Sequence, residues 1–377
     1  MSKEISNEKR QRKNKNDFLE IFNIFKNDDE YFSSVRKILG KGSFGEVREI
    51  VYKDKIMAGK IVMQENRVKS GENLAIDLRG RNIIKMNKII WKEIDNQYYY
   101  LIIMEKALLR DLGKLTEFSH HHNLLKLITP PFDEITSDSL LRFYAIQIIN
   151  ALELLNRNKF VHFDLKPENL LITINLIVKL SDFSLLMKVY DTDKIKIPGG
   201  TNGYISMEYY KKDEKISGKD ARKQDFFSLG ATLYYLKFGK QMIKIKNAED
   251  NEKNRLLMAE KLQKEISVIK SNKFFDQEFI DFLVSLIAYT PDERPEFEEI
   301  YRNKWLNKDL PELHETFYKF EYDEEKLMLE LQKQDFNVEL KKNIITKPNK
   351  FKFKKSEKNL KQNHLLNKNK MKNLFIK

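Results

Sequence analysis

The sequence FVHFDLKPENLLI occupies residues 160–172, and SDFS follows at residues 181–184 after a short apolar run. The first stretch places Asp164 and Asn169 in a loop that directly follows a long helical pattern, and the second contains Asp182. If the two stretches form a hairpin, these three side chains converge. Hard oxygen ligands such as Asn169 and Asp182 suit Mg²⁺ with phosphate-bound waters, and Asp164 becomes a candidate base. The residues alone also allow a plainer interpretation, in which Asp164 is a turn residue and the lysine two positions later is a solvated charge.

A glycine-rich motif, GKGSFGEV at residues 40–47, lies upstream between two predicted strands. Its glycines, Gly40, Gly42 and Gly45, let backbone N–H groups come close enough to bond phosphates. A dinucleotide-binding fold would have a helix after the glycines, whereas here the strand-like EVREIVY follows. The motif therefore favours a phosphate-binding hairpin, with a glycine-rich hairpin that binds nothing as the alternative.

Lys60 ends the sequence MAGK in a third predicted strand. An unpaired ammonium group is costly to bury, so a lysine in an apolar strand needs an anionic partner. The next segment, SGENLAIDLRGRNIIKM, can form a short helix and offers Glu72, which we prefer to Glu65 as that partner, with a phosphate as the second anion. The alternative is a lysine side chain that extends to solvent.

The periodicity of the chain changes from strand-like to helical. Residues 31–103 contain four strand patterns bounded by Gly, Asp or Asn, namely VRKILG, EVREIVY, KIMAGKIVM and YYYLIIM. From residue 137 apolar side chains recur at helical spacing, and similar patterns lie at 220–238, 251–270, 276–289 and 295–304. We therefore predict an α+β fold with two lobes, a small β-rich lobe followed by a larger helical lobe.

In this order and spacing, the motifs resemble those of the eukaryotic protein kinases of the serine/threonine type, over roughly residues 33–306. The resemblance implies the bilobal protein kinase fold, with an N-lobe at residues 31–106 and a C-lobe at residues 107–306. It implies ATP and Mg²⁺ as cofactors, and a protein substrate whose Ser or Thr hydroxyl receives the γ-phosphate. The alternative function is a pseudokinase scaffold or an anchoring protein, which acts through the kinase fold and the basic tail.

The resemblance also assigns roles by position. Asp164 is the expected catalytic aspartate, and Lys166 is the lysine at the γ-phosphate. Lys60, paired with Glu72, is the lysine at the α- and β-phosphates. The expected Mg²⁺ ligands are Asn169 and Asp182. The residues expected around ATP are Gly40, Gly42, Gly45, Val47, Ala58, Met104 at the gatekeeper position, Glu105 and Ala107 in the adenine-binding hinge, Asp111 at the ribose, and Leu171. Those expected to bind substrate or to support the activation segment are Thr201, Glu208, Asp225 and Arg294.

Several positions depart from the family pattern. Phe163 stands where many kinases have the arginine that binds an activation-loop phosphate, so the usual electrostatic gain from loop phosphorylation is missing. Ser184 replaces a glycine, and its narrower backbone freedom predicts that the segment flips less readily out of its metal-binding state. Ser206 and Met207 replace the usual Ala and Pro. None of these changes removes a group that touches ATP, Mg²⁺ or the transferred phosphoryl group, so we predict an active enzyme.

Composition excludes several other classes of protein. The 377 residues include no cysteine, which excludes disulfides, cysteine-bound metal sites and a thiol nucleophile. No apolar run is long enough to span a bilayer. Residues 1–16 contain no apolar core of the kind that signal peptides have. We therefore expect a cytoplasmic protein, with the nucleus as the alternative.

Basic segments lie at both ends of the chain, which carries a formal net charge of +13. We expect a basic, polar extension at residues 1–30, a second extension at residues 307–340 that can form a helix, and a disordered basic tail at residues 341–377. The tail has thirteen Lys against the single Glu357, a composition typical of segments that bind a polyanion or an acidic partner. Because lysine is abundant throughout the chain, solvated arms without a partner are the alternative.

Overall fold

The structure is a computed structural model of the chain, and it describes residues 18–42, 45–64, 71–107, 111–116, 137–173, 177–210, 215–244, 251–271 and 275–308. These residues belong to one compact unit, Met1–Leu313. Among them, no helix combines the length and the apolar character needed to cross a membrane. Glu65, residues 309–340 and the tail at 341–377, on which the sequence makes predictions, lie outside the described residues.

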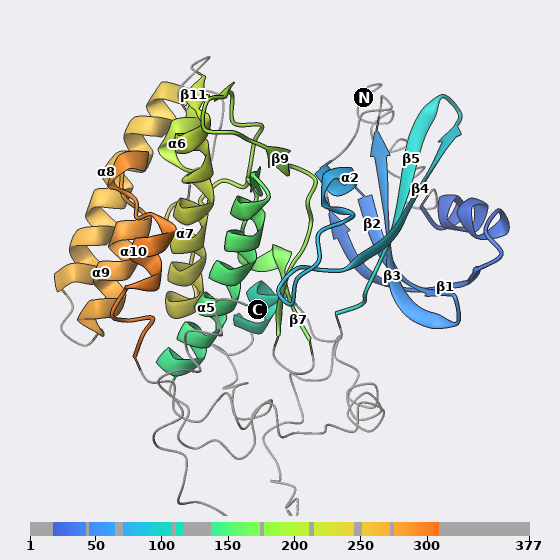
Figure 1. Cartoon of the computed structure of the whole chain (residues 1–377), viewed down its shortest axis with the longest axis horizontal. Coiled ribbons are helices and arrows are strands. Elements are labelled where there is room, and N and C mark those ends of the chain that lie inside the picture. Colours follow the sequence, from blue (N-terminus) through green and yellow to red (C-terminus); the bar gives the residue numbers. More distant parts are fainter. Residues whose placement is uncertain are drawn as a thin grey trace, which may run out of the picture. The chain divides into compact units, whose positions relative to one another are not determined.

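A five-stranded antiparallel sheet forms the first lobe, in the strand order β1-β2-β3-β5-β4 (Figure 1). Its strands are β1 (Phe32–Gly42), β2 (Gly45–Tyr52), β3 (Lys55–Gln64), β4 (Met86–Ile94) and β5 (Gln97–Met104). The sequence predicts four of these strands and misses β4. The register places Lys60 opposite Val47 on β2 and Ile102 on β5. Because directly paired residues share a face, these three side chains lie on one side of the sheet, here called the inner face.

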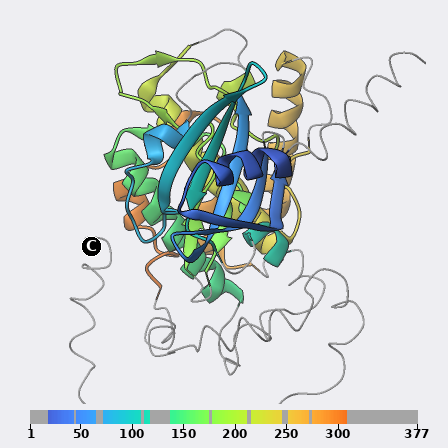
Figure 2. The ribbon, with the colours of Figure 1, turned by 90° about the vertical axis from the view of Figure 1, so that its right-hand side faces the viewer.

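A helix at residues 18–27 packs on the opposite, outer face of the sheet. In Figure 2 this dark blue helix lies across the strands. Its side chains Ile21, Phe22 and Phe25 are buried against apolar residues of the sheet, namely Phe32, Ile50, Tyr52, Met57, Ile61, Leu101 and Ile103. A Cβ at Gly59 would lie 3.2 Å from the ring of Phe22, so the glycine leaves room for that ring. The outer face is therefore a core, although the sequence assigns residues 18–27 to an extension outside the domain.

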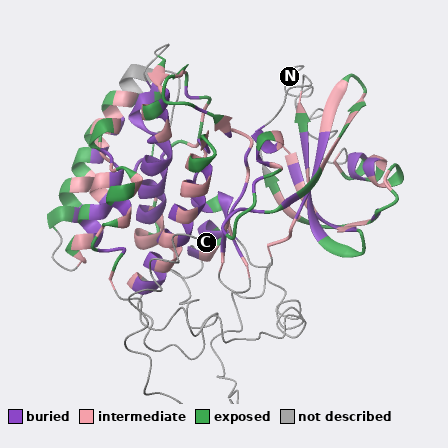
Figure 3. Ribbon diagram, viewed as in Figure 1, coloured by how far each residue is buried: buried purple, intermediate pink, exposed green. Residues whose placement is uncertain are grey.

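The second lobe is mainly helical, and α7 (Gln224–Phe238) is buried along most of its length (Figure 3). The other helices with described bounds are α5 (Ser137–Arg157), α6 (Gly218–Arg222), α8 (Asn251–Ser271), α9 (Gln277–Leu286) and α10 (Phe297–Tyr301).

The sequence predicts one helix over 220–238, but the structure divides it at Lys223. The Lys223 ammonium group donates to the carbonyls of Arg294 and Pro295, at 2.8 and 2.9 Å. The predicted α+β fold with two lobes is confirmed.

Short elements position the loops that carry polar side chains. The helix α2 (Gly71–Ala75) lies between β3 and β4. Paired short strands are β6 (Phe160–Val161) with β9 (Met187–Lys188), β7 (Leu170–Ile172) with β8 (Val178–Leu180), and β10 (Lys194–Ile195) with β11 (Ile216–Ser217). The described 3₁₀ helices are η1 (Pro167–Asn169), η2 (Met207–Tyr210) and η3 (Pro291–Glu293).

Candidate active site

The hairpin of β7 and β8 brings Asn169 and Asp182 to one place. Leu170 pairs with Leu180 across the hairpin. The backbone N–H and the hydroxyl of Ser181 both donate to the carbonyl oxygen of Asn169, each at 2.9 Å. Asn169 directly precedes β7 and Asp182 follows β8 by two residues, so both side chains lie at the same end of the hairpin. The hairpin that the sequence predicts is therefore present.

The carboxylate of Asp164 accepts several short hydrogen bonds. Its Oδ1 accepts from the hydroxyl of Thr201 at 2.6 Å, and its Oδ2 accepts from Lys166 Nζ at 2.8 Å. Lys166 Nζ also donates to the Thr201 hydroxyl at 2.7 Å. The amide nitrogen of Asn169 donates to the backbone oxygen of Asp164 at 2.8 Å and to its Oδ2 at 3.2 Å. Three other predicted site residues are thus gathered around this carboxylate.

Lys60 joins the two lobes through its ammonium group. Its Nζ lies 3.1 Å from Glu72 Oε1 on α2 and 2.6 Å from Asp182 Oδ1. Burial alone would lower the pKa of Lys60, but the charges of Asp182 and Glu72 outweigh burial, and the pKa is raised. Burial would likewise raise the pKa of Asp182, yet the charge and hydrogen bond of Lys60, with a further hydrogen bond from Ser184, lower it. The ammonium group and the Asp182 carboxylate are therefore both charged at neutral pH.

Asp225, near the start of α7, holds the backbone that precedes Asp164. Its buried carboxylate accepts from the backbone N–H groups of His162 at 2.8 Å and of Phe163 at 3.0 Å. Phe163 has a φ of 63°, a left-handed conformation that is rare for a bulky residue. Burial raises the pKa of Asp225, although His162 and the two N–H groups oppose the shift. These two hydrogen bonds stabilise the strained turn from which Asp164 projects.

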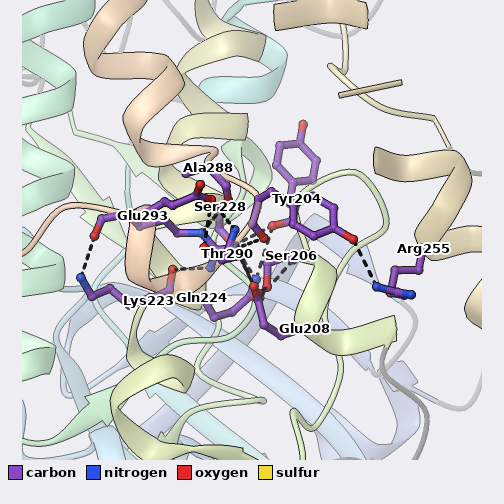
Figure 4. Close-up of polar contacts among 12 residues, drawn as sticks. Tyr204, Ser206, Glu208, Lys223, Gln224, Ser228, Arg255, Ala288, Thr290 and Glu293 are labelled. Carbon is purple, nitrogen blue, oxygen red and sulfur yellow. Dashed lines mark hydrogen bonds and ion pairs between the residues drawn. The ribbon is translucent and has the colours of Figure 1, made fainter. Parts of the chain in front are cut away.

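A buried ion pair fixes the far end of the segment from Asp182 to Glu208, here called the activation segment. Arg294 Nη2 donates to both carboxylate oxygens of Glu208, at 2.8 and 3.1 Å, and Arg294 is only 2% exposed. Figure 4 shows Ser206 and Gln224 beside the Glu208 carboxylate. The hydroxyl of Ser206 contacts both of these side chains. Ser206, one of the departures from the family pattern, therefore adds a polar contact to the pair.

The glycine-rich hairpin of β1 and β2 lies beside the part of β3 that contains Lys60. In the register of β1 and β2, Gly40 lies opposite Val47 and Gly42 lies opposite Gly45. A Cβ at Gly45 would lie 1.8 Å from the carbonyl oxygen of Ile61 on β3, so only glycine fits there. The three glycines and Val47 therefore lie in one hairpin, and Val47 is paired with Lys60.

The expected hinge residues follow directly from β5. Ala58 on β3 lies opposite Met104, the last residue of β5, and Glu105 to Ala107 continue the chain. The carboxylate of Glu105 accepts from the backbone N–H of Lys85 at 2.7 Å. Two further residues expected around ATP, Asp111 and Leu171, pair with each other in an isolated antiparallel bridge.

Comparison with known proteins agrees with this geometry. A family model described as the protein kinase domain matches residues 33–306, well over half of the chain. The chain belongs to the protein kinase family. It is 27% identical over 213 residues to serine/threonine-protein kinase MRCK beta of Rattus norvegicus, a match that covers 54% of this chain and 12% of that protein. It is 28% identical over 292 residues to the SNF1-like protein kinase ssp2 of Schizosaccharomyces pombe, covering 74% of this chain and 44% of that protein. The chain therefore spans less than half of the length of each of these relatives.

The oxygen atoms at the open end of the β7–β8 hairpin of this kinase fit a Mg²⁺ ion. Both described hydrogen bonds of the Asn169 side chain use its nitrogen, so its amide oxygen is available to a cation. The side chain of Asp182 is 35% exposed, although one of its oxygens already binds Lys60. Amide and carboxylate oxygens are the ligands that Mg²⁺ takes in proteins. Asn169 and Asp182 are therefore the residues that would hold the metal.

The middle of the kinase's activation segment is held by contacts that the sequence did not reveal. β10 pairs with β11, and the backbone N–H of Gly218 donates to the carbonyl of Asp193 at 2.9 Å. The guanidinium of Arg222 on α6 forms an ion pair with Asp191. A Cβ at Gly218 would lie 1.8 Å from the carbonyl oxygen of Tyr190, so the close approach requires glycine. Two opposite charges far apart in a sequence form no recognisable pattern, which is why only the structure identifies this pair.

Proposed function

We propose that this protein is an ATP-dependent serine/threonine protein kinase, which transfers the γ-phosphate of ATP to a hydroxyl of a protein substrate with the help of Mg²⁺. The observation that carries the proposal is the hydrogen bond from the Thr201 hydroxyl to Asp164. The candidate base thus already accepts a hydrogen bond from an alcohol, the group that a Ser or Thr substrate would present. The contacts of Lys60 with Glu72 and Asp182 favour catalysis over the pseudokinase scaffold.

The mechanism follows from the positions of the charges, because phosphoryl transfer depends on alignment and charge neutralisation more than on covalent chemistry by the protein. Asp164 orients the acceptor hydroxyl and accepts its proton. Lys166, which is 2.8 Å from Asp164, neutralises charge on the transferred group. Lys60, held by Glu72, binds the phosphates that stay on the nucleotide. Asn169 and Asp182 would hold Mg²⁺, which would supply additional charge neutralisation at the phosphates.

The direct test is phosphate transfer from Mg-ATP to a library of Ser, Thr and Tyr peptides. Asp164→Ala and Asp182→Ala should lower kcat by about 100-fold or more, because each removes positioning or charge stabilisation in the transition state. Asp54→Asn is the matched control, since Asp54 lies in the exposed β2–β3 turn at φ 59°, a conformation that Asn tolerates. If the wild type transfers no phosphate and Asp182→Ala leaves Mg-nucleotide binding unaltered, the scaffold is the correct function.

We propose further that catalysis does not require phosphorylation of the activation segment. Phe163 is buried and has no charge with which to pair a phosphate. The β10–β11 pairing and the ion pair of Asp191 with Arg222 support an ordered segment without one. Because Lys166 and Asp164 already bind Thr201, the substrate end of the segment is also docked on the site.

A second proposal concerns the basic tail at residues 341–377, which we expect to bind a polyanion or an acidic partner in the cytoplasm or nucleus. Its thirteen Lys against Glu357 support this, because exposed lysines that neutralise phosphates release counterions and give salt-sensitive binding. Truncation after Leu340 should reduce retention on heparin or RNA and leave peptide phosphorylation unchanged. Unchanged retention, or loss of activity on truncation, would contradict this role.

A further inference from the structure

The end of the glycine-rich hairpin contains a buried carboxylate between two cations. Glu46 is 2% exposed, although it lies only one residue from Gly45. Its Oε2 lies 2.7 Å from Lys41 Nζ across the hairpin, and its Oε1 lies 2.6 Å from Arg48 Nε on the same strand. Lys41 and Glu46 are opposite each other in the register of β1 and β2, an arrangement in which opposite charges stabilise a strand pair.

Arg48 connects this carboxylate with the helix at residues 18–27. Its guanidinium lies over the ring of Phe22, 6.0 Å from the ring centroid. Gly59, which faces Arg48 across β2 and β3, has no side chain, and this leaves the space that Phe22 occupies. A continuous series of contacts therefore runs from Phe22 through Arg48 and Glu46 to Lys41.

The two strands of the hairpin are supported differently. At Gly45, β2 lies so close to β3 that a Cβ would meet the carbonyl of Ile61, so this strand is fixed by its neighbour. Within the described part of the chain, β1 is an edge strand whose one partner is β2, and this pairing is irregular between Val35 and Gly40. Apart from the adjoining residues of the strand, no described atom lies within 4 Å of a Cβ built at Gly40. The β1 side of the hairpin end therefore depends strongly on contacts with β2.

We infer that Glu46 is a positioning residue for nucleotide binding. It holds Lys41, and with it the strand end from Gly40 to Gly42, at a fixed distance from β2. Val47, the next residue, faces the inner side of the sheet beside Lys60. The Glu46 carboxylate therefore lies on the outer face of β2, and it supports from that side the backbone that is proposed to bind the phosphates. This inference rests on the proposed function, since it assigns Mg-ATP as the ligand that the hairpin end contacts.

The experiment measures the Kd of a non-hydrolysable Mg-ATP analogue by calorimetry on the full chain. Glu46→Gln and Lys41→Gln should each weaken binding by about three- to tenfold, which corresponds to roughly 0.7 to 1.4 kcal/mol. The KM for ATP should rise in parallel, while kcat and the KM for peptide stay unchanged. Lys55→Gln is the matched control, because it removes the same charge from an exposed position at the far end of β3. An unchanged Kd in both hairpin variants would overturn the inference.

A double-mutant cycle separates positioning from a general loss of charge. The combined Lys41→Gln and Glu46→Gln variant should bind the analogue no more weakly than Glu46→Gln alone, whereas fully additive losses would overturn the inference. Lys41 is more than half exposed, so its variant remains informative even if Glu46→Gln fails to fold. A wild type that does not bind the analogue would refute the proposed function itself, whereas normal wild-type binding with unaltered variants refutes only the role of Glu46.

Discussion

Replacement of Phe22 by Ala tests whether the helix at residues 18–27 belongs to the folded domain. Phe22 is fully buried, and truncation of a buried Phe to Ala costs about 3 to 5 kcal/mol of unfolding free energy. Hydrogen-bonded strands lie beneath the ring and limit how far the site can collapse, which favours the middle of that range. Arg48 also loses the ring face beneath its guanidinium, worth about 0.5 to 1 kcal/mol. We therefore expect Phe22→Ala to destabilise the protein by about 4 kcal/mol.

The assay is urea unfolding followed by tryptophan fluorescence, because Trp91 lies on β4 and Trp305 lies in the second lobe. The matched control is Leu19→Ala in the same helix, where the side chain is 42% exposed. This control should change the unfolding free energy by less than about 0.5 kcal/mol. A loss below about 1 kcal/mol for Phe22→Ala, or equal losses for the two variants, would refute the conclusion that this helix completes the core of the first lobe.

Three further predictions follow from the charged contacts. The lowered pKa of Asp182 contributes stability that is present above its ordinary value of 3.8 and is lost as the pH falls through the folded-state pKa. Thermal melts between about pH 2 and pH 5 should therefore show a steeper acid loss for the wild type than for Lys60→Met. Parallel curves would contradict this. Phosphatase treatment should leave wild-type activity unchanged. Arg222→Ala should lower activity several-fold, because it removes the ion pair of Asp191. Loss of activity on phosphatase treatment, with full activity in Arg222→Ala, would indicate phosphate-dependent activation. Glu208→Gln leaves a buried guanidinium without its counter-charge and should cost about 3 kcal/mol in denaturant unfolding, so an unchanged midpoint would argue against the pair.

The strands and helices that the sequence predicts have strong local signals. The run YYYLIIM and the helical spacing after residue 137 correspond to β5 and α5. β4 is missed because MNKIIWKEI contains three charged residues and a bulge after Met86, so its alternation is imperfect. The helix at residues 18–27 is missed because it was grouped with the basic residues before it. The continuous apolar run of β5 indicated a strand in the middle of the sheet, since a strand with both faces buried has this pattern.

The identities and order of the motifs, from Gly40 to Arg294, were sufficient to predict the family and the fold class. They also named the residues of the candidate site, whose roles stay predictions. Such motifs can be recognised in a sequence because each consists of particular residue types at fixed short spacings. The sequence also offers Glu72 as the partner of Lys60, and the structure pairs these two side chains. Only the tertiary structure decided that Asp182 is a second partner of Lys60 and that Asp191 pairs with Arg222. It also decided that residues 18–27 cover the sheet and that Glu46 lies buried between two cations. The physical reason is that a charge or an apolar side chain has no fixed partner along the chain, and its contacts are set by strand register and by the packing of distant segments.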